Sequence, residues 1–173
     1  MPTTLKCADL PDCAECSKRS AGMFCNFLPK TLADFSGIGR PISLPAGTLF
    51  MREGYPCDQV YIVCRGQVKL SCSSKEGKTL SLKIARPGEV LGLSAAVSSS
   101  NFEMTGQTLV PSVLKVILQK EFLHFLHRYR EASWNATNSL AVEYRSAISG
   151  VRNLSLSPSV AGRVARLLLD LAE

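Results

Sequence analysis

The sequence from residue 42 to about residue 117 repeats one pattern, in which short runs of β-branched and apolar residues alternate with glycine. Five glycines recur at fairly even intervals, namely Gly47, Gly54, Gly66, Gly77 and Gly88. Glycine adopts the positive φ angles of tight turns without steric cost, so each one can mark a corner between two strands. The pattern predicts a small antiparallel β-roll or barrel, and it leaves a small β-sandwich open as the alternative.

Six runs are predicted to be strands of this β domain: Thr48–Arg52, Val60–Cys64, Gln67–Cys72, Thr79–Ile84, Glu89–Leu93 and Val113–Ile117. A hairpin is expected at Glu76-Gly77-Lys78, because two runs of alternating apolar residues flank this turn sequence and Gly77 can supply its positive φ. Before the β domain, residues 27–37 place Leu28, Leu32 and Phe35 at helical spacing and end in glycine, which predicts a short helix.

Beyond residue 118 the chain has almost no glycine or proline until Gly150 and Pro158, which predicts helix. A helix over 131–152 would be about 33 Å long. Six residues on it follow spacings of 3, 4, 3, 4 and 3, the a/d pattern of a coiled coil: Trp134, Thr137, Ala141, Tyr144, Ile148 and Val151. This narrow seam favours a homodimer, and a helix packed on its own β domain is the alternative. The stretch Asn153–Ser159 is expected to break the helix, with Ser157 as N-cap of an amphipathic segment that runs to Glu173.

The protein is expected to work in the cytoplasm. The first residues lack the apolar stretch of a signal peptide, and no run approaches the roughly 20 apolar residues of a membrane helix. Its seven cysteines are an odd number in a compartment that keeps thiols reduced, so metal or redox chemistry is favoured over disulfides. The net charge of +6 is compatible with DNA as a partner but does not require it. No nucleophile elbow, phosphate loop or acid/base pair indicates an enzyme.

The order of these parts resembles the Crp/Fnr family of transcription regulators. The resemblance rests on three segments and the long helix that follows them: residues 44–54 (LPAGTLFMREG), residues 60–70 (VYIVCRGQVKL) and residues 87–92 (PGEVLG). It implies an α+β fold, with an antiparallel, cupin-like double-stranded β-roll followed by a long dimerisation helix. In the family the roll binds the effector, the helix forms a parallel dimer, and a C-terminal winged helix-turn-helix binds DNA.

The effector pocket that this resemblance implies is degenerate. In members that bind cyclic nucleotides, a glutamate for the ribose follows the glycine matching Gly92, whereas Leu93 follows it here. No lysine or arginine occurs between Arg86 and Lys115 to bind the phosphate, and a carboxylate, Glu103, lies near the position of the family arginine. A bound phosphate without a cationic partner loses its hydration without compensation, so no cyclic nucleotide is expected to bind. The positions of this pocket are Gly88, Glu89, Gly92, Leu93, Glu103 and Thr105.

The motif Cys13-x2-Cys16-x8-Cys25, with Cys7 upstream, resembles the N-terminal segment that holds an iron–sulfur cluster in oxygen-sensing members. These four cysteines are the predicted metal ligands, since thiolates bind such clusters. The family's distal cysteine would lie near Val113–Ile117, where none occurs, so Cys7 is the expected fourth ligand. A structural zinc site, a thiol switch between Cys13 and Cys16, or no metal at all remain as alternatives.

The remaining cysteines and the histidines have simpler interpretations. Cys64 and Cys72 are predicted to be inert core residues because they alternate with apolar neighbours on their strands, and Cys57 has no evident role. His124 and His127 stand three apart on a predicted helix and are interpreted as surface residues, since no third metal ligand is spaced to join them.

Together, these features predict a cysteine-rich segment (1–26), a cyclic-nucleotide-binding-like roll (27–118), a dimerisation helix (119–153) and the start of a DNA-binding domain (154–173). The hypothesis is a homodimeric regulator that senses oxygen or redox state and contacts DNA only through a C-terminal domain absent from this chain. The alternative is a dimeric sensor or interaction module that never binds DNA. An open reading frame that continues beyond Glu173 into a helix-turn-helix would support the first.

Overall fold

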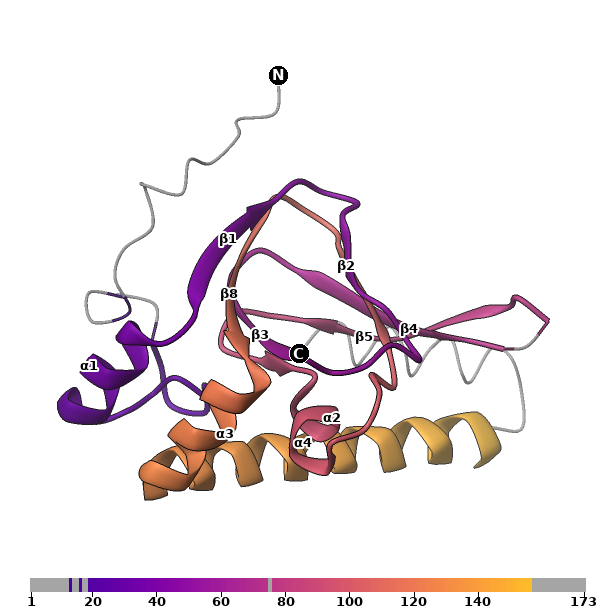
Figure 1. Ribbon diagram of the computed structural model, residues 1–173. Helices are drawn as coiled ribbons and strands as arrows, with labels where there is room; N and C mark the ends of the chain where they lie inside the picture. The colour runs from indigo at the N-terminus through magenta and orange to yellow at the C-terminus, as the bar shows by residue number, and fades with distance from the viewer. Residues whose placement is uncertain (1–12, 14–15, 17–18, 75, 157–173) are drawn as a thin grey trace. The chain divides into compact units, whose positions relative to one another are not determined.

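The computed structural model describes residues 13, 16, 19–74 and 76–156, with the side chains of 153–156 excepted (Figure 1). The chain forms two compact units, Met1–Thr137 and Asn138–Glu173, and each is considered by itself. Cys7 and the segment predicted to follow Ser157 lie outside the described residues. No helix in the described part of the chain is long and apolar enough to cross a membrane.

The first unit contains an antiparallel β-roll of two four-stranded sheets. One sheet has the strand order β1-β8-β3-β6 and the other β2-β7-β4-β5. The strands are β1 (Arg40–Leu44), β2 (Leu49–Met51), β3 (Gln59–Arg65), β4 (Val68–Ser73), β5 (Thr79–Ala85), β6 (Val90–Leu91), β7 (Thr105–Thr108) and β8 (Ser112–Leu118). The helices are α1 (Pro29–Gly37), α2 (Leu93–Ser98), α3 (Gln119–Arg128) and α4 (Arg130–Leu156). The predicted α+β fold, a roll followed by a long helix, is confirmed.

Glycine makes two of the predicted corners. Gly77 has φ +79° in the β4–β5 hairpin, and its backbone N–H donates to the Ser74 carbonyl at 3.0 Å, which confirms the predicted turn. The hairpin projects beyond the rest of the roll (Figure 1). Gly66 joins β3 to β4 with φ +96°, where an added Cβ would lie 2.2 Å from Ser112 Oγ. Four consecutive residues of β3, Val60–Val63, are buried, whereas in β4 the buried Val68 and Leu70 flank the half-buried Lys69.

Several elements differ from the sequence predictions. Strands β1 and β7 were not predicted, because each is short and gains its backbone partners only by pairing with a distant strand. Leu93, predicted to end a strand, instead begins α2. Helix α4 ends at Leu156, which lies within the stretch Asn153–Ser159 that was predicted to break the helix. Proline restricts the backbone of the residue before it, so Pro158 does not prevent helix as far as Leu156.

Helix α1 confirms the helix predicted over residues 27–37, and Pro29 starts it at a position where the missing N–H costs nothing. Leu32 and Phe35 are buried as their spacing predicted, whereas Leu28 precedes the helix and is exposed. The predicted helical region after residue 118 is two helices, because Tyr129 adopts an extended backbone between α3 and α4.

Candidate functional site

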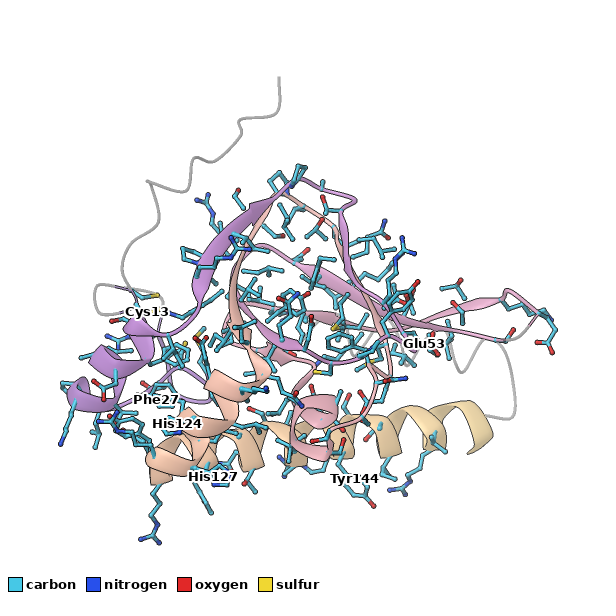
Figure 2. All side chains as sticks on the ribbon, viewed as in Figure 1. Cys13, Phe27, Glu53, His124, His127 and Tyr144 are labelled. Atoms are coloured by element: carbon cyan, nitrogen blue, oxygen red, sulfur yellow. The ribbon has the colours of Figure 1, made fainter. Side chains whose placement is uncertain are left out.

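Four cysteines line one cavity of about 40 Å³ on the α1 side of the roll. Cys13, Cys16 and Cys25 come from the segment before α1, and Cys64 comes from β3. Figure 2 shows Cys13 beside α1. Three of the four predicted metal ligands therefore line the same cavity, and a cysteine that was predicted to be inert also lines it.

Cys25 is positioned by two phenylalanines close to it in the sequence, Phe24 and Phe27. The rings of Phe24 and Phe27 lie 5.3 Å apart in an edge-to-face contact, and both are buried. Phe24 also contacts Phe35 of α1 and Phe122 of α3, at centroid distances of 6.0 and 5.6 Å. Buried aromatic pairs of this kind contribute more than their apolar area alone. The aromatic cluster thus fixes the segment that carries Cys25 against the helices.

A backbone contact holds the same segment on the roll. The N–H of Phe24 donates to the carbonyl of Gly88 at 3.1 Å, and the Met23 side chain covers Gly88. A Cβ at position 88 would lie 2.3 Å from Met23 Cγ, so only glycine permits this approach. Gly88 was predicted as part of the effector pocket, and the structure places it at the cysteine-lined cavity instead.

Cys64 reaches the cavity because of how β3 pairs with β8. Ile62 lies opposite Lys115 in this antiparallel pair, so Cys64 and Lys115 are close neighbours on the two strands. Cys64 shares a strand face with Ile62, as predicted, but both side chains line the cavity beside Cys13. Cys64 thus lines the cavity, and its interpretation as an inert residue remains a prediction. No local sequence signal marks Cys64 as a cavity residue, because only the pairing of β3 with β8 brings it there.

Lys115 is a buried cation in the wall of this cavity, with 4% of its surface exposed. Its Nζ lies 3.6 Å from Cys13 Sγ, donates to the Ser36 carbonyl at 3.1 Å, and lies 4.9 Å from the centre of the Phe35 ring. Within the described part of the chain, no carboxylate forms an ion pair with it. The sequence does not mark Lys115 as a site residue, since an alternating strand pattern does not reveal a charge that becomes buried.

The thiols influence one another electrostatically. Burial, followed by the nearby Cys16 and Cys13, raises the pKa of Cys25 to about 11. Burial, followed by Cys13 and Cys25, raises the pKa of Cys64 to about 12, while Lys115 acts in the opposite direction. The thiols of Cys25 and Cys64 are therefore protonated near neutral pH without a metal, and a metal that binds them must displace their protons.

The donor set fits a thiolate-bound metal centre, although the sulfurs do not converge on a single point. In the described residues, no group of three or more histidine, cysteine or acidic side chains is arranged to hold one ion. The thiolates of an iron–sulfur cluster bind different iron atoms and need not converge as the ligands of one zinc ion must. A cavity of about 40 Å³, however, is closer to the size of one ion or one or two water molecules. Cluster binding would require outward movement of the cysteine segment.

The residues predicted for the effector pocket lie in and around α2 and β7 and before β6. Leu93 is fully buried at the start of α2, and Glu103 is exposed. Glu89 pairs with Lys83 and accepts a hydrogen bond from the backbone N–H of Arg86. Gly92 is the N-cap of α2 with φ +79°, and an added Cβ there would lie 2.6 Å from the Phe102 ring.

Thr105, the last residue predicted for this pocket, accepts a hydrogen bond at its Oγ1 from the backbone N–H of Glu53 at 3.1 Å. Glu53 in turn accepts from the backbone N–H of Ser73. These polar groups therefore have partners within the chain. His124 and His127 are both exposed on α3, in agreement with the surface interpretation (Figure 2).

The cysteine segment contacts the beginning of α4. The Asn135 side-chain amide donates to the carbonyl of Phe24 at 2.9 Å and lies 3.4 Å from the carbonyl of Asn26, the residues on either side of Cys25. The backbone N–H of Leu28 donates to Glu131 at 3.1 Å. The first turns of α4 are thus bonded to the segment that carries a candidate metal ligand.

The six residues of the predicted dimer seam are all exposed on α4: Trp134, Thr137, Ala141, Tyr144, Ile148 and Val151. The exposed fractions of Trp134 and Tyr144 are 65% and 69%. These large apolar side chains are not buried within their own compact units. The alternative in which this face packs on the chain's own β domain is not supported for Trp134, which belongs to the same unit as the roll.

Comparisons with known proteins agree with this architecture. Residues 41–129 match the family of the cyclic nucleotide-binding domain. A relative from Mycobacterium tuberculosis, a CRP-like cAMP-activated global transcriptional regulator, is 27% identical over 154 residues, which are 88% of this chain and 68% of that protein.

Two solved structures show the same fold. One is the catabolite activator protein of Thermus thermophilus (TM-score 0.68, 19% identity, 78% of this chain and 63% of that one). The other is FixK2 of Bradyrhizobium japonicum (TM-score 0.67, 19% identity, 77% of this chain and 65% of that one). The chain thus spans somewhat less than two thirds of each. The match over residues 41–129 shows that the chain belongs to the cyclic nucleotide-binding domain family.

Proposed function

We propose that this chain is the sensory and dimerisation region of a cytoplasmic transcription regulator that responds to oxygen or redox state through its N-terminal cysteines. It acts as a regulator and not as an enzyme, and it does not depend on a cyclic nucleotide. The observation that carries the proposal is the cavity lined by Cys13, Cys16 and Cys25, whose segment is bonded to α4 through Asn135. A sensor needs such a connection between the site that changes and the element that responds.

The proposed signal passes from the thiols to the dimerisation helix. A change at Cys25 displaces the carbonyls of Phe24 and Asn26, to which Asn135 donates. The first turn of α4 is also held through Glu131, so two contacts depend on the same segment. Release of these contacts alters how α4 meets its partner in a homodimer. The spacing of two DNA-binding domains attached beyond the helix would follow that change.

Cys13, Cys16 and Cys25 are the proposed ligands of an iron–sulfur cluster. When bound, such a cluster would supply an oxygen-sensitive redox centre and the binding free energy that orders a short segment. The chain's own residues then keep the thiolates together through the Phe24 and Phe27 contacts. The second candidate is a single zinc ion or a thiol switch in a dimeric module that does not bind DNA. The small cavity suits one ion in volume, but the sulfurs would have to converge to hold zinc.

Independence from cyclic nucleotides is proposed because the polar groups that the ligand needs are missing. Leu93 offers no acceptor to a ribose hydroxyl, and the exposed carboxylate of Glu103 would repel a phosphate. The M. tuberculosis relative is described as cAMP-activated, but a sequence identity of 27% is too low to infer that this chain binds the same ligand.

Anaerobic purification followed by an absorption spectrum and by iron, sulfide and zinc analysis tests this proposal. We expect iron and sulfide in the parent chain and their loss in Cys13→Ser and Cys16→Ser. Cys72→Ser is the matched control, because Cys72 pairs with Leu80 in the β4–β5 hairpin away from the cavity. Zinc without sulfide would favour the second candidate, and a parent chain without any metal would refute the metal sensor.

A further inference from the structure

We propose that hydrogen peroxide couples the side chain of Lys115 on β8 to Cys13 through a sulfur–nitrogen bond, a sulfenamide, in the metal-free chain. This inference rests on the proposed function in one respect, because it specifies a chemical change by which the N-terminal cysteines respond to oxidation. It requires no metal ion. The new bond fastens the N-terminal segment to the roll when the chain is oxidised.

The two groups that form the bond are already in contact. The Nζ of Lys115 lies 3.6 Å from Cys13 Sγ, close to the separation of about 3–3.5 Å at which reacting atoms held in a protein are well placed. Two residues of α1 hold the amine at this point, since it donates to the Ser36 carbonyl at 3.1 Å and lies 4.9 Å from the centre of the Phe35 ring. The fold thus keeps an amine beside a thiol.

The size of the cavity suits this oxidant. Its volume of about 40 Å³ accommodates one or two molecules of the size of water, and hydrogen peroxide is a molecule of this kind. Cys13 is half-buried, so peroxide can reach its sulfur, whereas Lys115 is only 4% exposed. The sulfur–nitrogen bond adds no heavy atom to the cavity. Its formation therefore needs little rearrangement of the lining residues.

The reaction takes place in two steps. In the first step the Cys13 sulfur attacks peroxide, an S–O bond forms as the O–O bond breaks, and the thiol becomes a sulfenic acid while peroxide is reduced to water. In the second step Lys115 Nζ attacks that sulfur, an S–N bond forms as the S–O bond breaks, and a second water leaves. One proton of the ammonium group leaves with this water and another passes to solvent. Sulfenic acids are known to condense with nitrogen in this way.

The neighbouring thiols compete poorly for the oxidised sulfur. A sulfenic acid can also condense with a thiol to give a disulfide, but the thiolate is the attacking form. Burial, more than any other cause, raises the pKa of Cys25 to about 11 and the pKa of Cys64 to about 12. Both thiols are therefore protonated near neutral pH and attack slowly. The amine of Lys115 is in contact with the sulfur and is placed to react before them.

Formation of the bond also removes a buried charge. In the part of the chain that the structure describes, no carboxylate forms an ion pair with Lys115, and a buried cation without such a partner is costly. The sulfenamide nitrogen is neutral. The bond joins residues that are 102 apart in the sequence, and it restrains the unfolded chain as a disulfide does. We therefore expect the oxidised chain to melt at a higher temperature, and dithiothreitol to reverse the increase.

Peptide mapping tests the proposal directly. The full chain is treated with hydrogen peroxide in the presence of a chelator, its free thiols are alkylated, and it is digested with trypsin without reduction. We expect residues 7–18, which contain Cys13, to be joined to residues 84–120, which contain Lys115 and no cysteine. Because residues 84–120 lack a thiol, this product cannot be a disulfide. Its mass should equal the sum of the two peptides less two hydrogens, and dithiothreitol should separate them.

Variants identify the two atoms. Cys13→Ser and Lys115→Met should each abolish the joined peptide, whereas Cys16→Ser is the matched control and should retain it, because Cys16 lies on the same peptide. Lys115→Arg is a second test for the case in which Lys115→Met melts early. It keeps the positive charge, but a guanidinium group does not lose its proton in proteins and should not couple.

The outcomes separate this inference from the proposed function. A disulfide between Cys13 and Cys16 in place of the joined peptide would show that the inference is wrong while the redox response stands. A joined peptide that persists in Lys115→Met would also refute the inference. If the parent chain binds no metal and none of its cysteines reacts with peroxide, both proposals are wrong. A parent chain that contains no metal but yields the joined peptide would support the inference and refute the metal sensor alone.

Discussion

Replacing Phe24 with alanine would test whether the aromatic cluster holds the cysteine-bearing segment on the fold. Phe24 is 1% exposed and contacts the rings of Phe27, Phe35 and Phe122. Truncation of a buried phenylalanine to alanine typically costs about 3–5 kcal/mol. Because three rings lose an aromatic partner, we expect a cost in the upper part of this range, about 4 kcal/mol.

The lost free energy should mainly weaken docking of the cysteine-bearing segment. Phe24 lies in this segment, and its ring contacts Phe35 of α1 and Phe122 of α3. A change of about 4 kcal/mol corresponds to roughly a thousandfold increase in the population of the undocked segment. The rate at which a thiol reagent modifies Cys25 in the metal-free chain measures this population. We expect that rate to rise by two to three orders of magnitude, within the roughly thousandfold limit set by the lost contacts.

Phe102→Ala provides the comparison. Phe102 is also buried, at 6% exposed, but its ring packs beside Gly92 and α2. It should lower the free energy of unfolding of the chain by a similar amount without a selective increase in Cys25 modification. Equal modification rates in Phe24→Ala and the parent chain, despite a lower melting temperature, would refute the idea that this cluster positions Cys25.

Three further predictions concern the helix, the roll and the thiols. Ile148→Lys places two like charges across the proposed dimer axis, and sedimentation should show a monomer with a folded roll; an unchanged dimer would contradict the seam. Cyclic AMP or cyclic GMP at millimolar concentration should not raise the melting temperature, whereas a ligand at 100 times its Kd would add about 2.7 kcal/mol. Without metal, the contribution of these thiols to stability should be constant below pH 9 and be lost as the pH rises towards 11, because burial raises the pKa of Cys25 and Cys57 from 9.0 to about 11. The folded state holds these protons more tightly than the unfolded chain does, so a free energy of unfolding that stays flat through this window would contradict the burial of the thiols.

The sequence by itself determined the features that depend on local periodicity. Alternation of apolar residues located the main strands, Gly77 marked the hairpin, and the spacing from Trp134 to Val151 marked the long helix. The cysteine motif likewise located Cys13, Cys16 and Cys25 as one group, because all three lie within thirteen residues of one another. Each of these signals arises from neighbours in the chain, so it can be read without knowledge of the fold.

Only the tertiary structure decided the rest of the site. Cys64 and Lys115 are about fifty residues apart, and the pairing of β3 with β8 brings them together beside a segment that comes before both strands. Phe24 docks that segment through contacts with α1 and α3, and Lys115 is buried beside Phe35 of α1. Strand pairing and burial depend on contacts between residues far apart in the sequence, whereas residue patterns report only local preferences.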